Sequence, residues 1–390
     1  MKAISIAIGM IAAIVMTALG APAAETPSET YSRAKSLMNS GNLAAAMKVA
    51  QKYKGMKPKD HSGYQLCGLI LYRMGKADKA IEQFAKAKRL FPDDYVSETY
   101  TGFALLKKGQ AKKAVESFNK AAAMNGEYPD CFIGMGAASL KMQDPVKAKM
   151  HMKRAMKTAG DNDPEVYKRI AMTYLANGMK SDAAYVYNQY IKIEDENPDI
   201  FYRLGKVYES MGNRRCEKAY ERAIELKGKN PAYKEALAGW LMKQKRSGEA
   251  VALYEEAASL GSKNHEAYWQ TGLAAFRKGD YKKAAARIKK ALALKKDIPM
   301  AMMALSASLL RSGQYREAAE VSRRLTAKEP KNEGAWFNLA CACSMSGDKA
   351  AALGALRRSI ELEGSNAKAA RESEMFRKIK SDPEFIKITK

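Results

Sequence analysis

The chain of 390 residues carries 67 lysines and arginines against 42 aspartates and glutamates, which gives a formal net charge of +25. Its apolar share of 47% is enough to bury a large core and argues against disorder. Five cysteines and three histidines exclude a disulfide scaffold and leave little for metal or general-base chemistry.

The first 24 residues predict an export signal that is not part of the fold. Lys2 supplies a positive end, residues 3–19 are uncharged and apolar, and Ala21-Pro22-Ala23 offers small residues for cleavage. An uncleaved membrane anchor is the alternative, because about 17 to 20 apolar residues can just span a bilayer. With cleavage, we expect an exported protein of the periplasm, the cell envelope or the extracellular space that is not an integral membrane protein.

A period of 34 residues runs through the rest of the chain. Glycines recur at this step in three runs, at Gly41, Gly75 and Gly109, at Gly178 and Gly212, and at Gly279, Gly313 and Gly347. An alanine recurs at nearly the same step, with Cys216 as the exception: Ala46, Ala80, Ala114, Ala148, Ala183, Ala250, Ala284, Ala318 and Ala352. A fixed period of this length predicts an array of identical supersecondary units.

Each unit carries two apolar stripes at helical spacing on either side of its glycine, a pattern typical of a helical hairpin. In residues 61–94 we expect Gly75 to end the first helix in the left-handed conformation and Pro92 to stop the second. The predicted core of this hairpin consists of Tyr64, Cys67, Gly68, Leu71, Ala80, Phe84 and Ala87. A small residue in each helix lets the two helices approach closely.

This pattern resembles the tetratricopeptide repeat (TPR) family over nearly the whole mature chain. The small residue of the first helix recurs as Ala34, Gly68, Gly102, Gly136, Ala171, Gly205, Ala238, Gly272, Ser306 and Ala340. The resemblance, to an exported bacterial type, implies an all-α fold: a right-handed α-solenoid of about ten 34-residue helix-turn-helix hairpins with a C-terminal capping helix. The seventh repeat departs from the pattern, because Lys245 stands in place of the turn glycine.

The chain is accordingly predicted to divide into three parts. Residues 1–24 form the signal peptide, residues 27–366 form ten tandem repeats in one solenoid, and residues 367–390 form a capping helix and a basic tail. Stability is expected to be a sum over neighbouring repeats, with the cap covering the exposed face of the last one.

A curved stack of such hairpins places the first helix of each along a concave groove, where ligands would bind. The predicted groove residues with aromatic or long side chains are Tyr72, Phe103, Lys168, Tyr202, Lys206, Trp269, Phe276 and Phe337. A ladder of cations follows one position after the groove residues Tyr72 and Phe276, at Arg73, Lys107, Lys141, Lys243, Arg277 and Arg311. The ladder lacks rungs at Ala176 and Ser210.

The ladder has two interpretations. A cation in the last turn of a helix is favoured by the helix dipole, with no ligand implied. Alternatively, repeated cations beside aromatic rings form a track for an acidic peptide or an acidic glycan. The clamp that some relatives of this repeat use for acidic carboxyl termini is absent, because Lys168 is followed four residues later by Met172.

We predict no enzyme, no metal site and no cofactor, because no nucleophile-base pair, phosphate loop or ligand spacing stands out. The leading hypothesis is an exported protein-protein interaction scaffold that binds protein partners or peptides, acidic ones included, in an envelope assembly. The alternative is a binding module for an acidic polysaccharide or an anionic envelope surface. A nucleic-acid binder is permitted by the charge and disfavoured by export.

Overall fold

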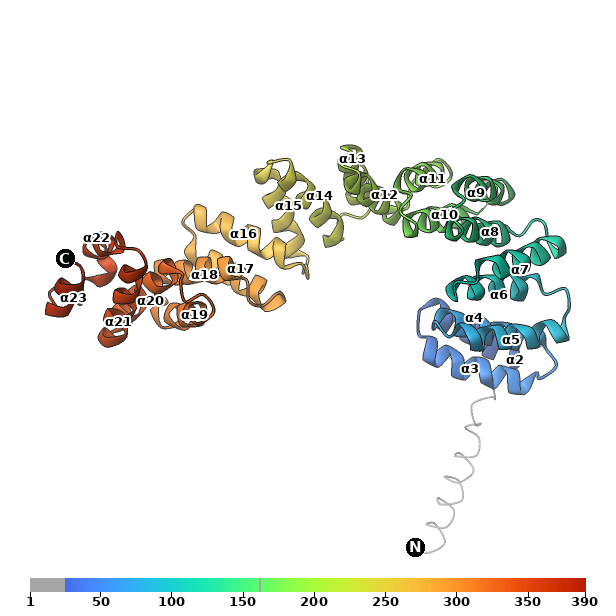
Figure 1. The fold of residues 1–390 in the computed structure, drawn as a ribbon, viewed down its shortest axis with the longest axis horizontal. Coiled ribbons are helices and arrows are strands. Elements are labelled where there is room, and N and C mark those ends of the chain that lie inside the picture. The colour runs from blue at the N-terminus through green and yellow to red at the C-terminus, as the bar shows by residue number, and fades with distance from the viewer. Residues whose placement is uncertain (1–24, 161–162) are drawn as a thin grey trace, which may run out of the picture. The chain divides into compact units, whose positions relative to one another are not determined.

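The computed structural model describes residues 25–160 and 163–390, so the predicted signal peptide lies outside the described residues. Over those two ranges the protein is built of α-helices with one short 3-10 turn and no β-strand (Figure 1). The predicted all-α fold of repeated helical hairpins is confirmed.

The helices form two compact units that meet in the sequence between Glu194 and Asp195. Within each unit, consecutive helices pack in pairs as hairpins, and we call the first helix of a pair helix A and the second helix B. The first unit contains α2 (Pro27–Asn39), α3 (Leu43–Met56), α4 (His61–Arg73), α5 (Ala77–Leu90), α6 (Tyr95–Lys107), α7 (Ala111–Met124), α8 (Pro129–Lys141), α9 (Pro145–Ala159), α10 (Pro164–Ala176) and α11 (Lys180–Ile193).

The second unit continues the same alternation and ends in shorter elements. It contains α12 (Pro198–Ser210), α13 (Arg215–Leu226), α14 (Pro231–Lys243), α15 (Ser247–Ser259), α16 (His265–Arg277), α17 (Tyr281–Leu294), α18 (Pro299–Arg311), α19 (Tyr315–Lys328), α20 (Glu333–Ser346), α21 (Lys349–Leu362), α22 (Asn366–Glu372), η1 (Glu374–Phe376) and α23 (Pro383–Ile388).

Successive A helices lie side by side within each unit. In the first unit α4 contacts both α2 and α6, and α8 contacts both α6 and α10; in the second unit α18 contacts both α16 and α20. This close approach puts the A helices on the inner side of each stack, where a repeat array presents its concave surface.

The turn between helices A and B depends on one residue in the left-handed conformation. Gly75 has a φ of 77°, as predicted, and the other predicted turn glycines share this conformation. Where the glycine is missing the turn is nevertheless kept, since Gln143 has a φ of 61° and Lys245 a φ of 62°. The seventh repeat therefore keeps its turn geometry at a conformational cost of about 1 to 2 kcal/mol.

The small residues of helix A are required by the large residue of helix B. A Cβ added to Gly68 would lie 2.5 Å from the ring of Phe84, and one added to Gly205 would lie 2.5 Å from the ring of Tyr220. Both rings are fully buried. In these hairpins a large ring on helix B thus fills the space left by a glycine on helix A.

The core of the second hairpin differs from the prediction at two positions. Cys67, Gly68, Ala80, Phe84 and Ala87 are buried as predicted, whereas Tyr64 and Leu71 are only half-buried. Leu66 and Ile70 are buried in their place and pack with residues of the preceding hairpin. Helix A has two neighbours to pack against, its own helix B and the previous repeat, and the predicted pattern counted only the first.

The C-terminal segment folds more completely than the predicted capping helix and basic tail. After α22, the η1 turn buries Phe376 and a further helix, α23, buries Phe385. The two rings lie 5.6 Å apart, and Phe376 also packs 5.7 Å from Phe337 of α20. Asp382 caps α23 through the backbone N–H of Glu384 and Phe385, so the last residues close over the final hairpin.

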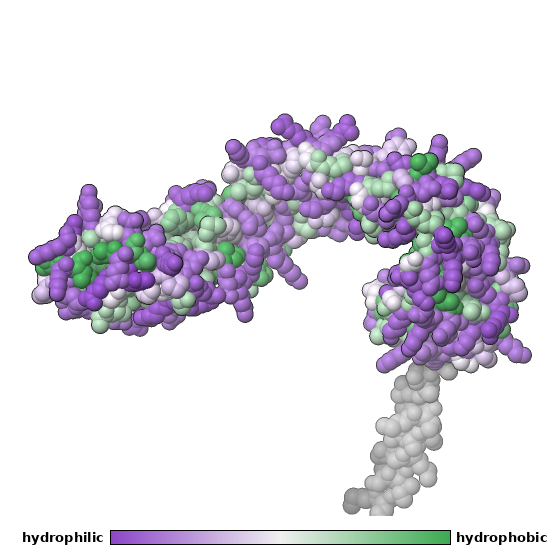
Figure 2. Space-filling view, in the orientation of Figure 1, coloured by the Kyte–Doolittle hydropathy of each residue, from purple (hydrophilic) through white to green (hydrophobic). Residues whose placement is uncertain are grey.

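All five cysteines are unpaired and buried: Cys67, Cys131, Cys216, Cys341 and Cys343. Burial raises the pKa of each thiol, to about 11 for Cys216 and about 12 for Cys341. Among the helices of residues 25–160 and 163–390, none combines the length and the apolar character that a membrane crossing requires. Hydrophilic side chains cover most of the surface in view, and apolar residues form smaller areas (Figure 2).

Candidate functional site

The predicted groove residues all lie on A helices, and they divide by exposure. The aromatic residues and one lysine are half-buried: Tyr72, Phe103, Lys168, Tyr202, Trp269, Phe276 and Phe337. The remaining cations are exposed: Arg73, Lys107, Lys141, Lys206, Lys243, Arg277 and Arg311. The aromatic rings therefore stand at the boundary between the core and the helix-A face.

An aromatic cluster forms on the helix-A face of the first unit. The ring of Tyr72 lies 5.7 Å from Tyr100 and 6.4 Å from Phe103, and the rings of Tyr100 and Phe103 are 5.6 Å apart. The Nζ of Lys107 sits 3.9 Å from the centre of the Tyr72 ring. Burial, followed by the neighbouring Tyr100, raises the pKa of Tyr72 to about 12, so this cluster stays neutral and largely apolar.

Two of the ladder cations bind the preceding repeat through its backbone. The Nη1 of Arg73 donates to the carbonyl oxygen of Met38 at 2.9 Å, and the Nζ of Lys107 donates to that of Tyr72 at 3.0 Å. Both carbonyls belong to the last turn of the previous helix A, where backbone acceptors lack helical partners. These cations therefore join one repeat to the next.

A polar chain continues from this cluster along the first unit. Asp130 is 3% exposed and forms an ion pair with Arg169 of α10. The hydroxyl of Tyr128 donates to Asp130 Oδ2 at 3.2 Å. Burial and then the carboxylate of Asp130 raise the pKa of Tyr100. Sequence reasoning missed these residues, because acids recur at this position of helix A as Asp130, Glu165 and Asp199, and the sequence does not show that Asp130 is the buried one.

In the second unit the predicted cations meet at one carboxylate. Glu209 accepts hydrogen bonds from Lys243 Nζ at 2.7 Å, from Tyr220 Oη at 2.7 Å and from Lys206 Nζ at 3.1 Å. Burial acts to raise the pKa of Glu209, but the hydrogen bonds from these three groups outweigh it and the pKa is lowered. The ring of Tyr202 packs 6.1 Å from Tyr220.

The other predicted residues have separate surroundings. Lys168 pairs with Glu165 at 2.9 Å, and Phe276 packs 5.3 Å from Tyr281, over which Arg311 stacks at 5.7 Å. Trp269 packs against the C-terminal core cluster. Within the described part of the chain, the side chains of Lys141 and Arg277 take part in no ion pair or hydrogen bond. The helix-A face is thus a set of local clusters.

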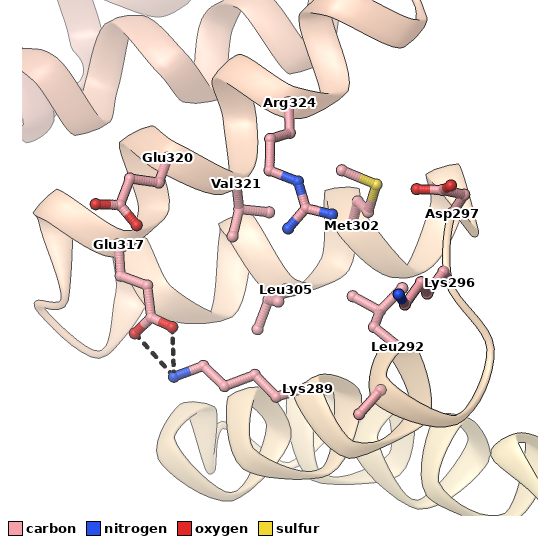
Figure 3. Close-up of a pocket in the computed structure, with 11 residues that line it drawn as sticks. Lys289, Leu292, Lys296, Asp297, Met302, Leu305, Glu317, Glu320, Val321 and Arg324 are labelled. Carbon is pink, nitrogen blue, oxygen red and sulfur yellow. Dashed lines mark hydrogen bonds and ion pairs between the residues drawn. The ribbon is translucent and has the colours of Figure 1, made fainter.

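A pocket of about 450 Å³ lies between α17 and α19, over α18, in the second unit (Figure 3). Leu292, Met302 and Leu305 form its apolar floor, and the Nζ of Lys289 pairs with Glu317 at 2.7 Å on its rim. Cations and acids alternate around it without excess of either sign. In the two described ranges, no group of three or more histidine, cysteine, aspartate and glutamate side chains is arranged to hold a metal ion.

Models of the tetratricopeptide repeat family match residues 66–130, 198–230, 240–299 and 303–368, which is more than half of the chain. No curated protein matches it.

Solved structures resemble the chain only distantly. PilW, a type IV pilus biogenesis factor, is 22% identical over 56% of this chain and 100% of its own, with a TM-score of 0.42. PilF of Pseudomonas aeruginosa is 17% identical over 52% of this chain and 93% of its own, with a TM-score of 0.38. YrrB, described as a TPR protein with an unusual peptide-binding site, is 22% identical over 46% of this chain and 92% of its own, with a TM-score of 0.30.

Together with the left-handed turns and the paired small and large core residues, the family matches lead to one conclusion: the chain belongs to the tetratricopeptide repeat family.

Proposed function

We propose that the protein is an exported interaction scaffold whose helix-A face binds protein partners in an envelope assembly. The aromatic cluster of Tyr72, Tyr100 and Phe103 carries the proposal, because half-buried aromatic rings on a concave face supply the anchors on which protein interfaces depend. The repeat family supports a protein-interaction role, and the export component rests on the predicted signal in residues 1–24.

The charges of the helix-A face favour a partner held mainly by packing. Arg73 and Lys107 already bind carbonyls of the preceding repeat, and Lys206 and Lys243 already share Glu209. These cations are exposed, so water and salt screen their charge and they add little net attraction for an acidic peptide.

Site-specific photocrosslinking tests the proposal. A photoreactive phenylalanine analogue at position 103 keeps an aromatic ring in the cluster, and the same analogue at Tyr185 serves as the control, since Tyr185 is 59% exposed on α11. We expect position 103, and not position 185, to capture a defined protein partner in intact cells. Equal capture from both positions, or none from position 103, would contradict the scaffold proposal.

The charge of the B helices favours a second candidate, a module for an acidic polysaccharide or another anionic surface of the envelope. Both α9 and α17 carry five lysines and arginines with no acidic residue.

We expect the fourfold variant Arg73→Gln, Lys107→Gln, Arg277→Gln and Arg311→Gln to leave the melting curve nearly unchanged. If it also binds an acidic glycan as well as the wild type does, the helix-A ladder is not the track, and the cations of α9 and α17 remain as the binding surface. Loss of binding between roughly 50 and 200 mM salt would point to polyanion electrostatics.

A further inference from the structure

The outer face of α9 joins apolar and cationic side chains in one stripe. Val146, Met150, Lys153 and Lys157 are spaced by four, three and four residues, which places them on the same side of the helix. Val146 is 77% exposed and Met150 is 58% exposed, whereas Met152 on the opposite side is fully buried in the hairpin. The stripe is therefore a solvent-facing surface that the packing of the hairpin does not explain.

The cations at the C-terminal half of α9 are not neutralised. Lys147 pairs with Asp144 and Lys149 pairs with Asp182, but Lys153, Arg154 and Lys157 form no ion pair with any acid in residues 25–160 or 163–390. Arg154 is held in place, since its guanidinium lies 4.2 Å from the centre of the buried Phe132 ring.

A shallow cavity of about 900 Å³ opens beside this stripe. Met150, Lys153, Arg154 and Lys157 line one side of it, and the loop before α8 lines the other, with Glu127 as its acidic group. Three cations thus converge on a concave surface with an apolar side chain at its edge. A bound anionic group would meet more positive than negative charge there.

We propose that the outer face of α9 docks on an anionic lipid bilayer. Val146 and Met150 enter the interfacial region, and Lys153, Arg154 and Lys157 contact lipid phosphates. A basic helix face with exposed apolar residues binds bilayers in two ways at once: its apolar side chains are buried in the interfacial region, and its cations are attracted to anionic headgroups. A soluble polyanion would attract the three cations equally well but would leave Val146 and Met150 in water, so the apolar half of the stripe favours lipid.

This surface is separate from the helix-A face, because it is formed by a helix B. It specifies a site and a partner class for the anionic-surface candidate, and it holds or fails independently of the protein scaffold. A helix-A variant at Phe103 is expected to bind vesicles as the wild type does.

Vesicle flotation with residues 25–390 tests the proposal. This segment contains every helix that the structure describes, and it lacks the apolar residues 3–19, which would themselves bind lipid. We expect binding to vesicles of phosphatidylcholine with phosphatidylglycerol and not to vesicles of phosphatidylcholine alone. The variant Lys153→Gln, Arg154→Gln and Lys157→Gln should bind about a hundredfold more weakly.

Two further variants separate the α9 site from general electrostatics. The matched control Lys112→Gln, Lys113→Gln and Lys120→Gln removes the same charge from exposed positions of α7, where the one exposed large apolar residue, Met124, is the last residue of the helix. This control should bind vesicles within a few-fold of the wild type. The double variant Val146→Ser and Met150→Ser should lose about tenfold in vesicle affinity and keep its affinity for soluble polyphosphate.

Three results would overturn the lipid site. The first is an equal loss of vesicle affinity in the α7 and α9 charge variants, which would mean that binding depends on the net charge of the protein and not on the α9 site. The second is unchanged vesicle affinity in the double variant, which would mean that Val146 and Met150 do not enter the bilayer and that the three cations serve to bind a soluble polyanion. The third is no binding of the wild type to anionic vesicles, provided that circular dichroism shows the protein to be folded.

Discussion

Three cations of the ladder on the helix-A face bind the preceding repeat, and they do so differently in the two units. In the first unit, Arg73 and Lys107 donate to backbone carbonyls of the previous helix A. In the second unit, Lys243 reaches a side chain, Glu209, which also binds Lys206 and the buried Tyr220. The cation at the end of helix A therefore caps a backbone carbonyl in the first unit and binds a carboxylate in the second.

The difference shows where a charge on this face is replaceable. A lysine or arginine that caps a carbonyl can be removed at little cost, because the carbonyl keeps a backbone donor: Gly41 N–H donates to Met38 and Gly75 N–H donates to Tyr72. A carboxylate that holds a buried tyrosine hydroxyl cannot be removed as easily, since the hydroxyl is left without a partner.

The largest expected effect is at Glu209. The substitution Glu209→Ala should destabilise the second unit by about 3 kcal/mol, because it leaves the Tyr220 hydroxyl buried and two lysines without an acid. Urea unfolding followed by circular dichroism, with hydrogen exchange of the α12 and α13 amides, measures this loss. As a control, Glu165→Ala removes an exposed partner of Lys168 and should cost less than about 0.5 kcal/mol. Equal losses would show that the Glu209 network stabilises the fold no more than an exposed ion pair does.

Acid should weaken the Glu209 network in a defined direction. Its pKa is lowered in the folded protein relative to the ordinary value of 4.5. A lowered pKa means that the network stabilises the fold fully above pH 4.5 and progressively less as the pH falls through the folded-state value. Thermal melts from neutral to acidic pH should therefore converge for the wild type and Glu209→Gln. A constant difference between them across this range would show that ionisation of Glu209 does not contribute.

The smallest expected effect concerns the two turns without glycine, one in each unit. Lys245→Gly and Gln143→Gly should each stabilise the protein by about 0.5 kcal/mol, because relief of the left-handed strain exceeds the added chain entropy. The reverse change, Gly75→Gln, should destabilise by about 1 kcal/mol. Denaturant midpoints measure all three changes. A loss of stability in either glycine variant would show that contacts of the native side chain stabilise the fold by more than the left-handed strain costs.

The sequence predicts the hairpins and their turns well, because each 34-residue copy repeats the same local constraints. The turn at Gly75 and the pairing of Gly68 with Phe84 are examples. The sequence does not predict Glu209, Asp130 or Tyr100 as central groups, since each acts through a partner on another helix, and the repeat pattern does not show which side chains meet between helices. The burial of Leu66 and Ile70 was missed for a related reason, because it depends on the preceding hairpin.

The aromatic cluster and the α9 stripe illustrate two kinds of surface signal. Tyr72 and Phe103 stand at predicted positions of helix A, and the structure adds Tyr100 on the same face and the buried rings of Phe84 and Phe118 beneath it. The α9 stripe requires exposure to be known, because a valine and a methionine at helical spacing are ordinary core residues until the opposite side of the helix is seen to be the buried one.

The buried thiols offer a way to follow the motions of individual repeats. Because burial keeps each thiol protonated and covered, alkylation must wait for its hairpin to open. Cys67 in α4, Cys131 in α8, Cys216 in α13 and the Cys341 and Cys343 pair in α20 report on four separate places. The chain therefore carries its own kinetic probes of fraying, and the order in which its cysteines react would rank the repeats by their local opening free energy.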